Sequence, residues 1–172
     1  ASDVYKRQCL HVKTGLLIMH KMSLNSFPLE SYMKMMNIDA VSVCTFTKAH
    51  CQPSIDALES GKHVLVEKPM AATSEEAIRM VQASQKNDKI LMVGMKWRFM
   101  PEILAAKSFI ENQKLGSIYY AEAIGWQHRG IPGKTFIRRE TAGGGAFMDN
   151  GVYTLDAAMY LMGHCLLYTS PS

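Results

Sequence analysis

Residues 39–69 read DAVSVCTFTKAHCQPSIDALESGKHVLVEKP, with two short valine-rich runs on either side of a helical segment. The run at residues 40–44 is bounded by polar residues and predicts a buried strand. Residues 53–60 predict a helix that stops at Gly61, because glycine readily takes the left-handed conformation that ends helices. Residues 63–67 predict a second strand. This order is typical of a helix that connects two parallel strands.

The same alternation continues on both sides of this stretch. Thr73 and Glu76 have the spacing of a capping box at the start of a helix, and residues 89–94 predict a third strand. Further helices are expected over residues 101–110 and, upstream, over residues 26–36. Alternating helices and strands predict an α/β fold, the C-terminal part of a Rossmann-like doubly wound parallel sheet with helices on both faces.

The pattern changes near residue 115. The next segments predict a longer strand, a loop rich in glycine and arginine, and a helix, over residues 117–126, 128–145 and 147–162. We therefore expect residues 9–115 to belong to the doubly wound domain. Residues 116–164 are expected to begin a second, α+β open-sheet domain.

The two ends of the chain are related through the DNA that can encode them. Residues 165–170 can be encoded by a string whose reverse complement encodes residues 3–7, and the string resembles the transposase end sequence used to fragment DNA libraries. We expect residues 1–8 and 165–172 to derive from library DNA and the rest to be part of a longer gene. Residues 9–25 favour neither strand nor helix.

The composition narrows the class of protein. The 172 residues are 48% hydrophobic and 20% charged, which is typical of a globular chain and excludes disordered, collagenous and disulfide-rich classes. The apolar runs are short and the net charge of +4 is scattered, so we expect no membrane and no nucleic-acid partner. The four cysteines lack metal-ligand spacing, so we expect no metal site and a cytoplasmic location.

Polar residues follow the predicted strands, and an open parallel sheet binds ligands at the carboxyl ends of its strands. Glu67-Lys68-Pro69 is the sharpest of these strand ends, because the proline ring fixes the backbone next to the lysine. A surface ion pair of Glu67 and Lys68 is the alternative interpretation. His50 precedes the following helix and either packs on the sheet or faces a ligand as a donor.

A run of three glycines at residues 143–145 precedes the last predicted helix. It allows the close approach of another backbone or of an anion, or it is a flexible loop. Asp149, Tyr153 and Asp156 follow at spacings that stack on one helix face. These three residues are either part of a site or a solvated helix edge.

Together these segments resemble the Gfo/Idh/MocA oxidoreductases, the family of glucose–fructose oxidoreductase and inositol dehydrogenase. The resemblance covers residues 26–163 in the order of the family. The matching positions are residues 39–45 with His50, residues 57–69, Arg98-Phe99 with Pro101, residues 143–145, and Asp149, Gly151, Tyr153 and Asp156.

The resemblance implies a nicotinamide-dinucleotide domain followed by a domain with substrate and dimer contacts, hence a homo-oligomer at full length. It implies NAD or NADP as cofactor, with contacts from Thr45, His50, Glu67, Lys68 and Arg98. Lys68 is also implied to be catalytic, because it contacts the reacting hydroxyl, and Asp149 is implied to orient the substrate. Many members carry a proton-transferring histidine at the position of Tyr153, so the sequence departs from that pattern. A tyrosine at this position is similar to the glucose–fructose oxidoreductase branch.

Oxidation of a hydroxyl carbon needs a hydride acceptor and a base for the hydroxyl proton. Our hypothesis is a Lys68–Tyr153 pair oriented by Asp149, in which the ammonium favours the phenolate. Alternatively, Lys68 is itself the base. The sequence departs from the family's Thr-Pro-Asn at residues 45–47, which read Thr-Phe-Thr.

The resemblance thus implies an NAD(P)-dependent dehydrogenase that transfers a hydride between a nicotinamide cofactor and a hydroxyl carbon of a sugar or polyol. The alternatives are an NAD-dependent glycoside hydrolase on the same scaffold and a non-catalytic cofactor-sensing protein. The family's glycine-rich phosphate turn and the acidic residue of its second strand are expected upstream. We therefore expect this chain by itself to bind dinucleotide poorly and to be inactive.

Overall fold

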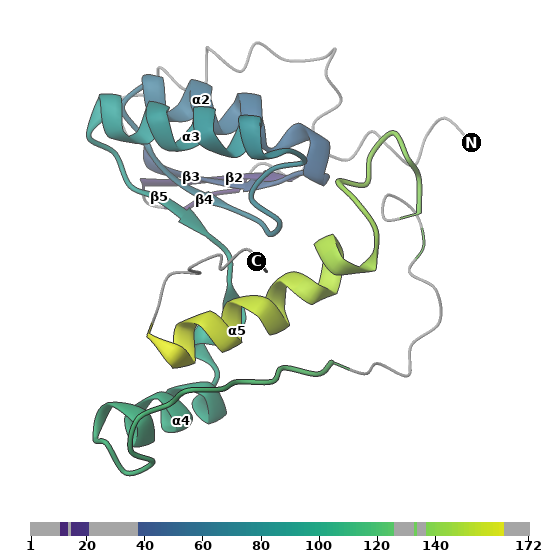
Figure 1. Ribbon diagram of the computed structural model, residues 1–172. Helices are drawn as coiled ribbons and strands as arrows, with labels where there is room; N and C mark the ends of the chain where they lie inside the picture. Colours follow the sequence, from purple (N-terminus) through teal and green to yellow (C-terminus); the bar gives the residue numbers. More distant parts are fainter. Residues whose placement is uncertain (1–10, 14, 21–37, 126–132, 134–136, 164–172) are drawn as a thin grey trace. The chain divides into compact units, whose positions relative to one another are not determined.

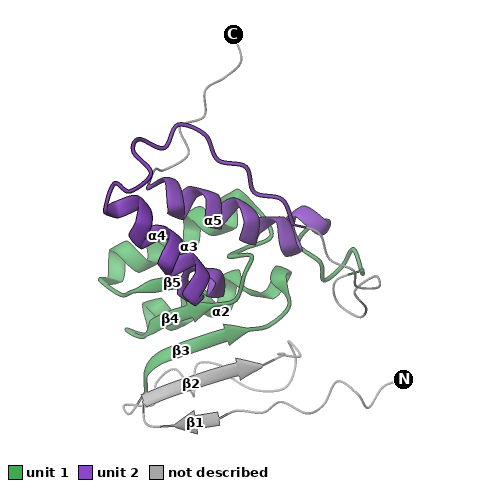
Figure 2. Cartoon of the chain, turned by 90° about the horizontal axis from the view of Figure 1, so that it is seen from below, with its two compact units in different colours: residues 1–94, 131–145 green, residues 95–130, 146–172 purple. Residues whose placement is uncertain are grey.

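The computed structural model describes residues 11–13, 15–20, 38–125, 133 and 137–163. The chain divides into two compact units, residues 1–94 with 131–145 and residues 95–130 with 146–172 (Figure 2). The division between the two units falls between Gly94 and Met95, before the predicted domain boundary near residue 115. That domain boundary stays a prediction. The predicted helix at residues 26–36 and both expected library-derived ends lie outside the described residues.

The first unit contains a five-stranded sheet in the order β1-β2-β3-β4-β5. β1 (His11–Lys13) is antiparallel to β2 (Gly15–His20), and the sheet continues in parallel through β3 (Ile38–Cys44), β4 (His63–Val66) and β5 (Leu91–Val93). Of the four strands predicted from the sequence, those at residues 40–44, 63–67 and 89–94 are confirmed as β3, β4 and β5. The stretch that favoured neither strand nor helix contains β1 and β2.

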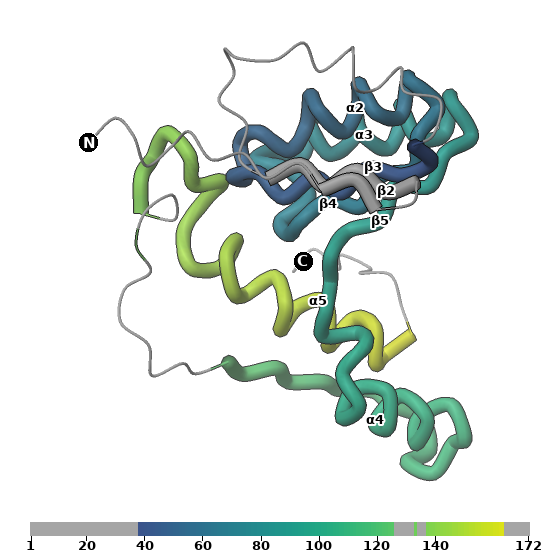
Figure 3. Tube along the Cα trace, turned by 180° about the vertical axis from the view of Figure 1, so that it is seen from behind, coloured from purple at the N-terminus to yellow at the C-terminus, as the bar shows by residue number. Residues whose placement is uncertain are grey.

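Two helices connect these strands and lie side by side on one face of the sheet (Figures 1 and 3). α2 (Cys51–Glu59) joins β3 to β4, and α3 (Ser74–Asn87) joins β4 to β5. Both crossovers run in the same direction along the sheet, so right-handed connections place both helices on the same face. The parallel sheet of the predicted Rossmann-like α/β fold is confirmed. The strand order does not reverse within β3-β4-β5, so the helices that join these three strands lie on one face.

Local sequence explains where α2 and α3 begin and end. Gly61, with φ of 76°, follows α2 as the predicted left-handed terminator. Thr73 caps α3, because its hydroxyl oxygen accepts a hydrogen bond from the backbone N–H of Glu76 at 3.2 Å. Glu76 in turn accepts from the N–H of Ala72 at 3.1 Å. Hydrogen bonds from its own backbone N–H and from Thr73 hold the pKa of Glu75 below its usual value.

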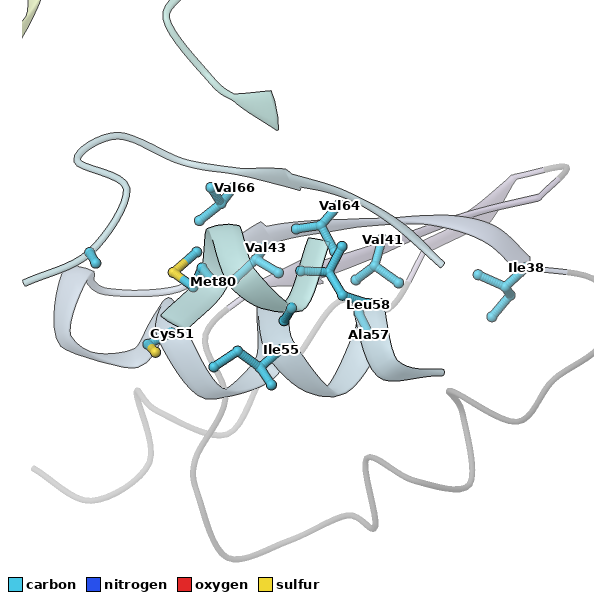
Figure 4. Packing of buried hydrophobic residues seen from close by; sticks show 12 residues of the cluster. Ile38, Val41, Val43, Cys51, Ile55, Ala57, Leu58, Val64, Val66 and Met80 are labelled. Carbon is cyan, nitrogen blue, oxygen red and sulfur yellow. The ribbon is translucent and has the colours of Figure 1, made fainter. Parts of the chain in front are cut away.

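The core lies between the sheet and these two helices (Figure 4). β3 and β4 pair Val41 with Val64 and Val43 with Val66, so these four valines point to the same face. The other buried members of the cluster are Ile38, Cys51, Ile55, Ala57, Leu58, Ala71, Met80 and Ala83. Each large apolar side chain buried here stabilises the fold by about 2 kcal/mol. This packing fixes the carboxyl ends of β3 and β4 relative to each other.

The second unit is built from helices. A 3-10 turn, η2 (Lys96–Phe99), leads into α4 (Pro101–Glu111). The predicted helix at residues 147–162 is confirmed, with a π-helical first turn, η4 (Phe147–Gly151), followed by α5 (Val152–Met162). A Cβ on Gly151 would lie only 2.7 Å from Cδ2 of Phe147, so this position favours glycine. Across the described residues, no helix has both the length and the hydrophobicity needed to cross a membrane.

The strand predicted at residues 117–126 is wrong over its described part, residues 117–125, which contains no strand. Its aromatic and branched side chains are exposed, with Tyr119 at 93%, Tyr120 at 69% and Ile124 at 63%. A strand exists only where a neighbouring backbone accepts and donates its hydrogen bonds. The described part of the second unit holds no strand that could pair with this segment.

Candidate functional site

The carboxyl end of β3 runs into a short 3-10 turn, η1 (Thr47–Ala49), that leads to α2. The hydroxyl of Thr45 donates a hydrogen bond to the carbonyl oxygen of Ala49 at 2.9 Å and so closes this turn. Because β3, β4 and β5 are parallel, their carboxyl ends lie at one edge of the sheet. Thr45, Glu67 and Gly94 therefore share this carboxyl edge.

His50 links two of these strand ends. Its imidazole is 1% exposed, with Nδ1 2.8 Å from the carbonyl oxygen of Pro69 and Nε2 3.1 Å from the carbonyl oxygen of Thr45. Each ring nitrogen thus faces a backbone carbonyl oxygen, and the nitrogen that carries the proton donates a hydrogen bond to one of them. Of the two sequence interpretations, the structure favours a packed histidine over one that faces a ligand.

The end of β4 leads into Glu67, Lys68 and Pro69, the strand end that the sequence singled out as a candidate site. The N–H of Glu67 donates to the carbonyl oxygen of Val43 at 2.9 Å, and the N–H of Lys68 donates to Oε2 of Glu67 at 3.2 Å. Glu67 is exposed, Lys68 is half-buried, and the Lys68–Pro69 peptide bond is cis. The carboxyl edge therefore holds an acceptor and a donor side chain at adjacent positions.

The glycine-rich loop packs onto the same edge in the first unit. Lys48, on the η1 turn, donates from Nζ to the carbonyl oxygen of Arg139 at 2.6 Å. Gly143 lies so close to Thr47 that a Cβ on this glycine would overlap the threonine side chain, and it would lie 3.5 Å from Cα of Ala72. Of the two interpretations of this run, close backbone approach is the one that the structure favours at Gly143.

In the second unit, Arg98 is held by Asp156. Its Nε lies 2.9 Å from Oδ2 and its Nη2 lies 2.6 Å from Oδ1, which is a bidentate pair. The hydrogen bonds with Asp156 raise the pKa of Arg98 above its usual value. The guanidinium also lies 5.2 Å from the ring centroid of Tyr160. Arg98, predicted as a cofactor contact, thus orders η2 against α5.

Tyr153 lies in the first turn of α5 and is 7% exposed. Its ring stacks on Trp97, with centroids 5.2 Å apart and planes inclined by 15°. Nζ of Lys96 lies 5.5 Å from the centroid of the same ring. Asp149 lies four residues earlier, in the π-helical turn, and its Oδ2 accepts from Asn150 at 3.2 Å.

The predicted site residues thus form two groups. Thr45, His50, Glu67 and Lys68 share the carboxyl edge of the first unit, while Arg98, Asp149 and Tyr153 belong to the second. The hypothetical Lys68–Tyr153 pair joins one residue from each unit and stays a prediction.

Sequence reasoning assigned no role to Thr47, Lys96 or Trp97. An aromatic residue beside a lysine just after a predicted strand was the available signal for Lys96 and Trp97. Within the described segments, no three His, Cys, Asp or Glu side chains gather as a metal site requires.

Comparison with known proteins agrees with this architecture. A family model described as "Oxidoreductase family, NAD-binding Rossmann fold" matches residues 11–95, and one described as "GFO/IDH/MocA C-terminal domain" matches residues 103–166. The chain belongs to the Gfo/Idh/MocA oxidoreductase family.

Individual relatives are dehydrogenases of sugars and a polyol. The chain is 38% identical over 126 residues to D-glucoside 3-dehydrogenase of Escherichia coli (strain K12). This alignment covers 73% of this chain and 36% of that protein. It is 32% identical over 127 residues to Myo-inositol 2-dehydrogenase of Thermotoga maritima, covering 74% of this chain and 37% of that protein.

A solved structure of levoglucosan dehydrogenase in complex with NADH and levoglucosan is also similar. It aligns with a TM-score of 0.68 and 31% identity over 78% of this chain and 38% of that chain. The chain therefore spans little more than a third of the length of the relatives that it matches.

Proposed function

We propose that the protein to which this chain belongs is an NAD(P)-dependent dehydrogenase. It transfers a hydride between the nicotinamide cofactor and a hydroxyl carbon of a sugar or polyol. The observation that carries this proposal is the carboxyl edge of the first unit, where His50 links the ends of β3 and β4 next to Glu67 and Lys68. Dehydrogenase relatives of sugars and inositol support the substrate class.

The residues at this edge fit a nicotinamide dinucleotide. Its ribose hydroxyls and carboxamide need acceptors as well as donors, and Glu67 and Lys68 supply one of each at adjacent positions. The Thr45 hydroxyl donates to the backbone and both His50 nitrogens face backbone carbonyl oxygens, so these two residues would support the cofactor by shaping the strand end. The bound nicotinamide would accept or donate the hydride.

Three side chains carry the proposed chemistry. Lys68 contacts the reacting hydroxyl, Asp149 orients the substrate, and Tyr153 takes the hydroxyl proton as a phenolate. Tyr153 is almost fully buried, and a nearby cation favours the charged form of a buried phenol. Arg98 acts through Asp156 to hold the η2 turn, in addition to the cofactor contact proposed from the resemblance.

The proposal extends to partners and location. We propose a cytoplasmic homo-oligomer, on the basis of the family resemblance and the cysteine usage of the chain. The glycosidase and cofactor-sensing alternatives are not favoured, because the relatives named above are dehydrogenases.

The test uses the complete protein that contains this chain, a panel of sugars and polyols, and both NAD⁺ and NADP⁺. Formation of reduced cofactor on a free sugar or polyol is the expected result. Tyr153→Phe and Lys68→Met should each lower kcat by about 10²–10⁴-fold, the usual contribution of a proton-transferring side chain. Wild-type rates in both variants, or dinucleotide binding without turnover across the panel, would contradict the proposal.

A further inference from the structure

The surroundings of Tyr153 contain two neighbours that the proposed mechanism does not use. Trp97 stacks on the phenol ring at 5.2 Å, and Nζ of Lys96 lies 5.5 Å from the ring centroid. Both neighbours come from η2, which begins two residues after Gly94. One short turn thus supplies both an aromatic face and a cation to a single ring.

Two other described cations, Arg98 and Lys107, contact other side chains around α5. Arg98 of η2 forms its bidentate pair with Asp156 of α5. From α4, Lys107 lies over Tyr160, 5.2 Å from its centroid, and 3.7 Å from Oε1 of Glu111. Asp149 of the π-helical turn lies four residues before Tyr153 in the chain, and its negative charge opposes a phenolate.

We propose that Lys96 and Trp97 are positioning residues for Tyr153. Trp97 fixes the plane of the phenol ring by stacking, and Lys96 favours the phenolate form by placing a positive charge over it. This inference rests on the proposed function, in which Tyr153 exchanges the substrate proton. As the hydroxyl carbon is oxidised, the O–H proton passes to the phenolate oxygen, the hydride leaves to the cofactor, and a carbonyl forms.

This inference differs from the hypothesis of a Lys68–Tyr153 pair in the origin of the cation. Lys68 belongs to the first unit, whereas Lys96 and Tyr153 belong to the same compact unit. The contact between Lys96 and Tyr153 therefore lies within a single unit. The proposed contact of Lys68 with the reacting hydroxyl is unchanged.

The chain offers a direct reporter of Tyr153 ionisation, because its only tryptophans are Trp97 and Trp126. In a Trp126→Phe background, Trp97 is the sole tryptophan, and a phenolate stacked on it quenches its fluorescence. The fluorescence of this chain is titrated with pH, and Tyr153→Phe should abolish the quenching step.

Three lysine variants then test the role of the cation. Lys96→Met should raise the quenching midpoint by about one pH unit, because an exposed cation at this distance shifts a neighbouring acid by that order. Lys96→Arg should keep the midpoint at or below its original value, because the charge is retained. The matched control, Lys107→Met, removes the lysine over Tyr160 and should leave the midpoint unchanged.

An unchanged midpoint in Lys96→Met, or the same rise in Lys96→Arg, would overturn the electrostatic role. The absence of any quenching step that depends on Tyr153 would overturn the stacking role of Trp97. In the complete enzyme, Lys96→Met should shift the acid limb of the kcat profile with little change in KM. If Tyr153→Phe abolishes turnover but Lys96→Met leaves the acid limb of the kcat profile in place, the proposed function stands and this inference fails.

Discussion

The carboxyl edge of the first unit and the surroundings of Tyr153 in the second are held by different kinds of interaction. At the carboxyl edge, side chains bond to backbone, as His50 does to Thr45 and Pro69. Around α5, side chains contact one another, as in the Trp97–Tyr153 stack and the Arg98–Asp156 pair.

This difference predicts how each region responds to mutation. When a side chain that hydrogen-bonds to a buried backbone group is removed, that backbone group loses its partner. The free energy of unfolding then falls, and a rotamer change of a neighbouring side chain cannot restore it. Contacts between partly exposed side chains are screened by solvent and contribute less to stability. Mutations of side chains bonded to backbone in the first unit should therefore lower the free energy of unfolding strongly. Mutations around Tyr153 in the second unit should lower it less and should change the ionisation of Tyr153 more.

The largest effect is expected from the core that supports the carboxyl edge. Leu58→Ala removes a fully buried side chain between α2 and the sheet and should lower the free energy of unfolding by about 2–5 kcal/mol. Urea denaturation of the parent chain and the variant measures this loss in the free energy of unfolding. Leu65→Ala, at a strand position that is 40% exposed, is the matched control and should cost about 1 kcal/mol or less. Equal losses in both variants would contradict the described core.

The next effect tests the backbone-bound histidine. His50→Ala leaves the carbonyl oxygens of Thr45 and Pro69 without their side-chain partner and should destabilise the chain by about 2 kcal/mol. His63→Ala is the control, because His63 is less buried and accepts a single hydrogen bond, from the N–H of Ile90. A larger loss for His63→Ala than for His50→Ala would show that His50 is not the link.

A smaller effect is expected at the glycine-rich loop. Gly143→Ala should cost about 1–2 kcal/mol, because the new methyl group overlaps the side chain of Thr47. Thr47→Ser removes the overlapping methyl and should restore part of the loss in the double variant. Thermal unfolding of the two single variants and the double variant measures this coupling. Additive losses would mean that the two residues are not in contact.

The smallest effect is expected for the side-chain pair of the second unit. Arg98→Met should cost about 0.5–1 kcal/mol, because the arginine is 44% exposed and its charge is screened. The raised pKa of Arg98 keeps its charge, so this contribution should persist unchanged as the pH rises through the neutral range. Added salt should reduce the difference in stability between the parent chain and the Arg98→Met variant. If Arg98→Met lowered the free energy of unfolding as much as Leu58→Ala does, the predicted difference between the two units would be wrong.

Much of the first unit was predictable because its signals are local. Valine runs predict buried strands, Gly61 predicts a helix end, and the Thr73–Glu76 spacing predicts a cap, and each depends only on neighbours in the chain. The predicted strand at residues 117–126 failed over its described part because pairing depends on a second backbone. For the same reason, the antiparallel pairing of β1 with β2 did not emerge from residues 9–25.

The sequence by itself determined the α/β class, the order of β3, α2, β4, α3 and β5, and the residues at the strand ends. Only the tertiary structure decided that His50 bonds to two backbone carbonyls, that Gly143 lies against Thr47, and that Tyr153 contacts both Trp97 and Lys96. These contacts join residues 5 to 96 positions apart. Sequence periodicity reports which face a residue occupies, whereas its neighbour across the fold depends on how the segments pack.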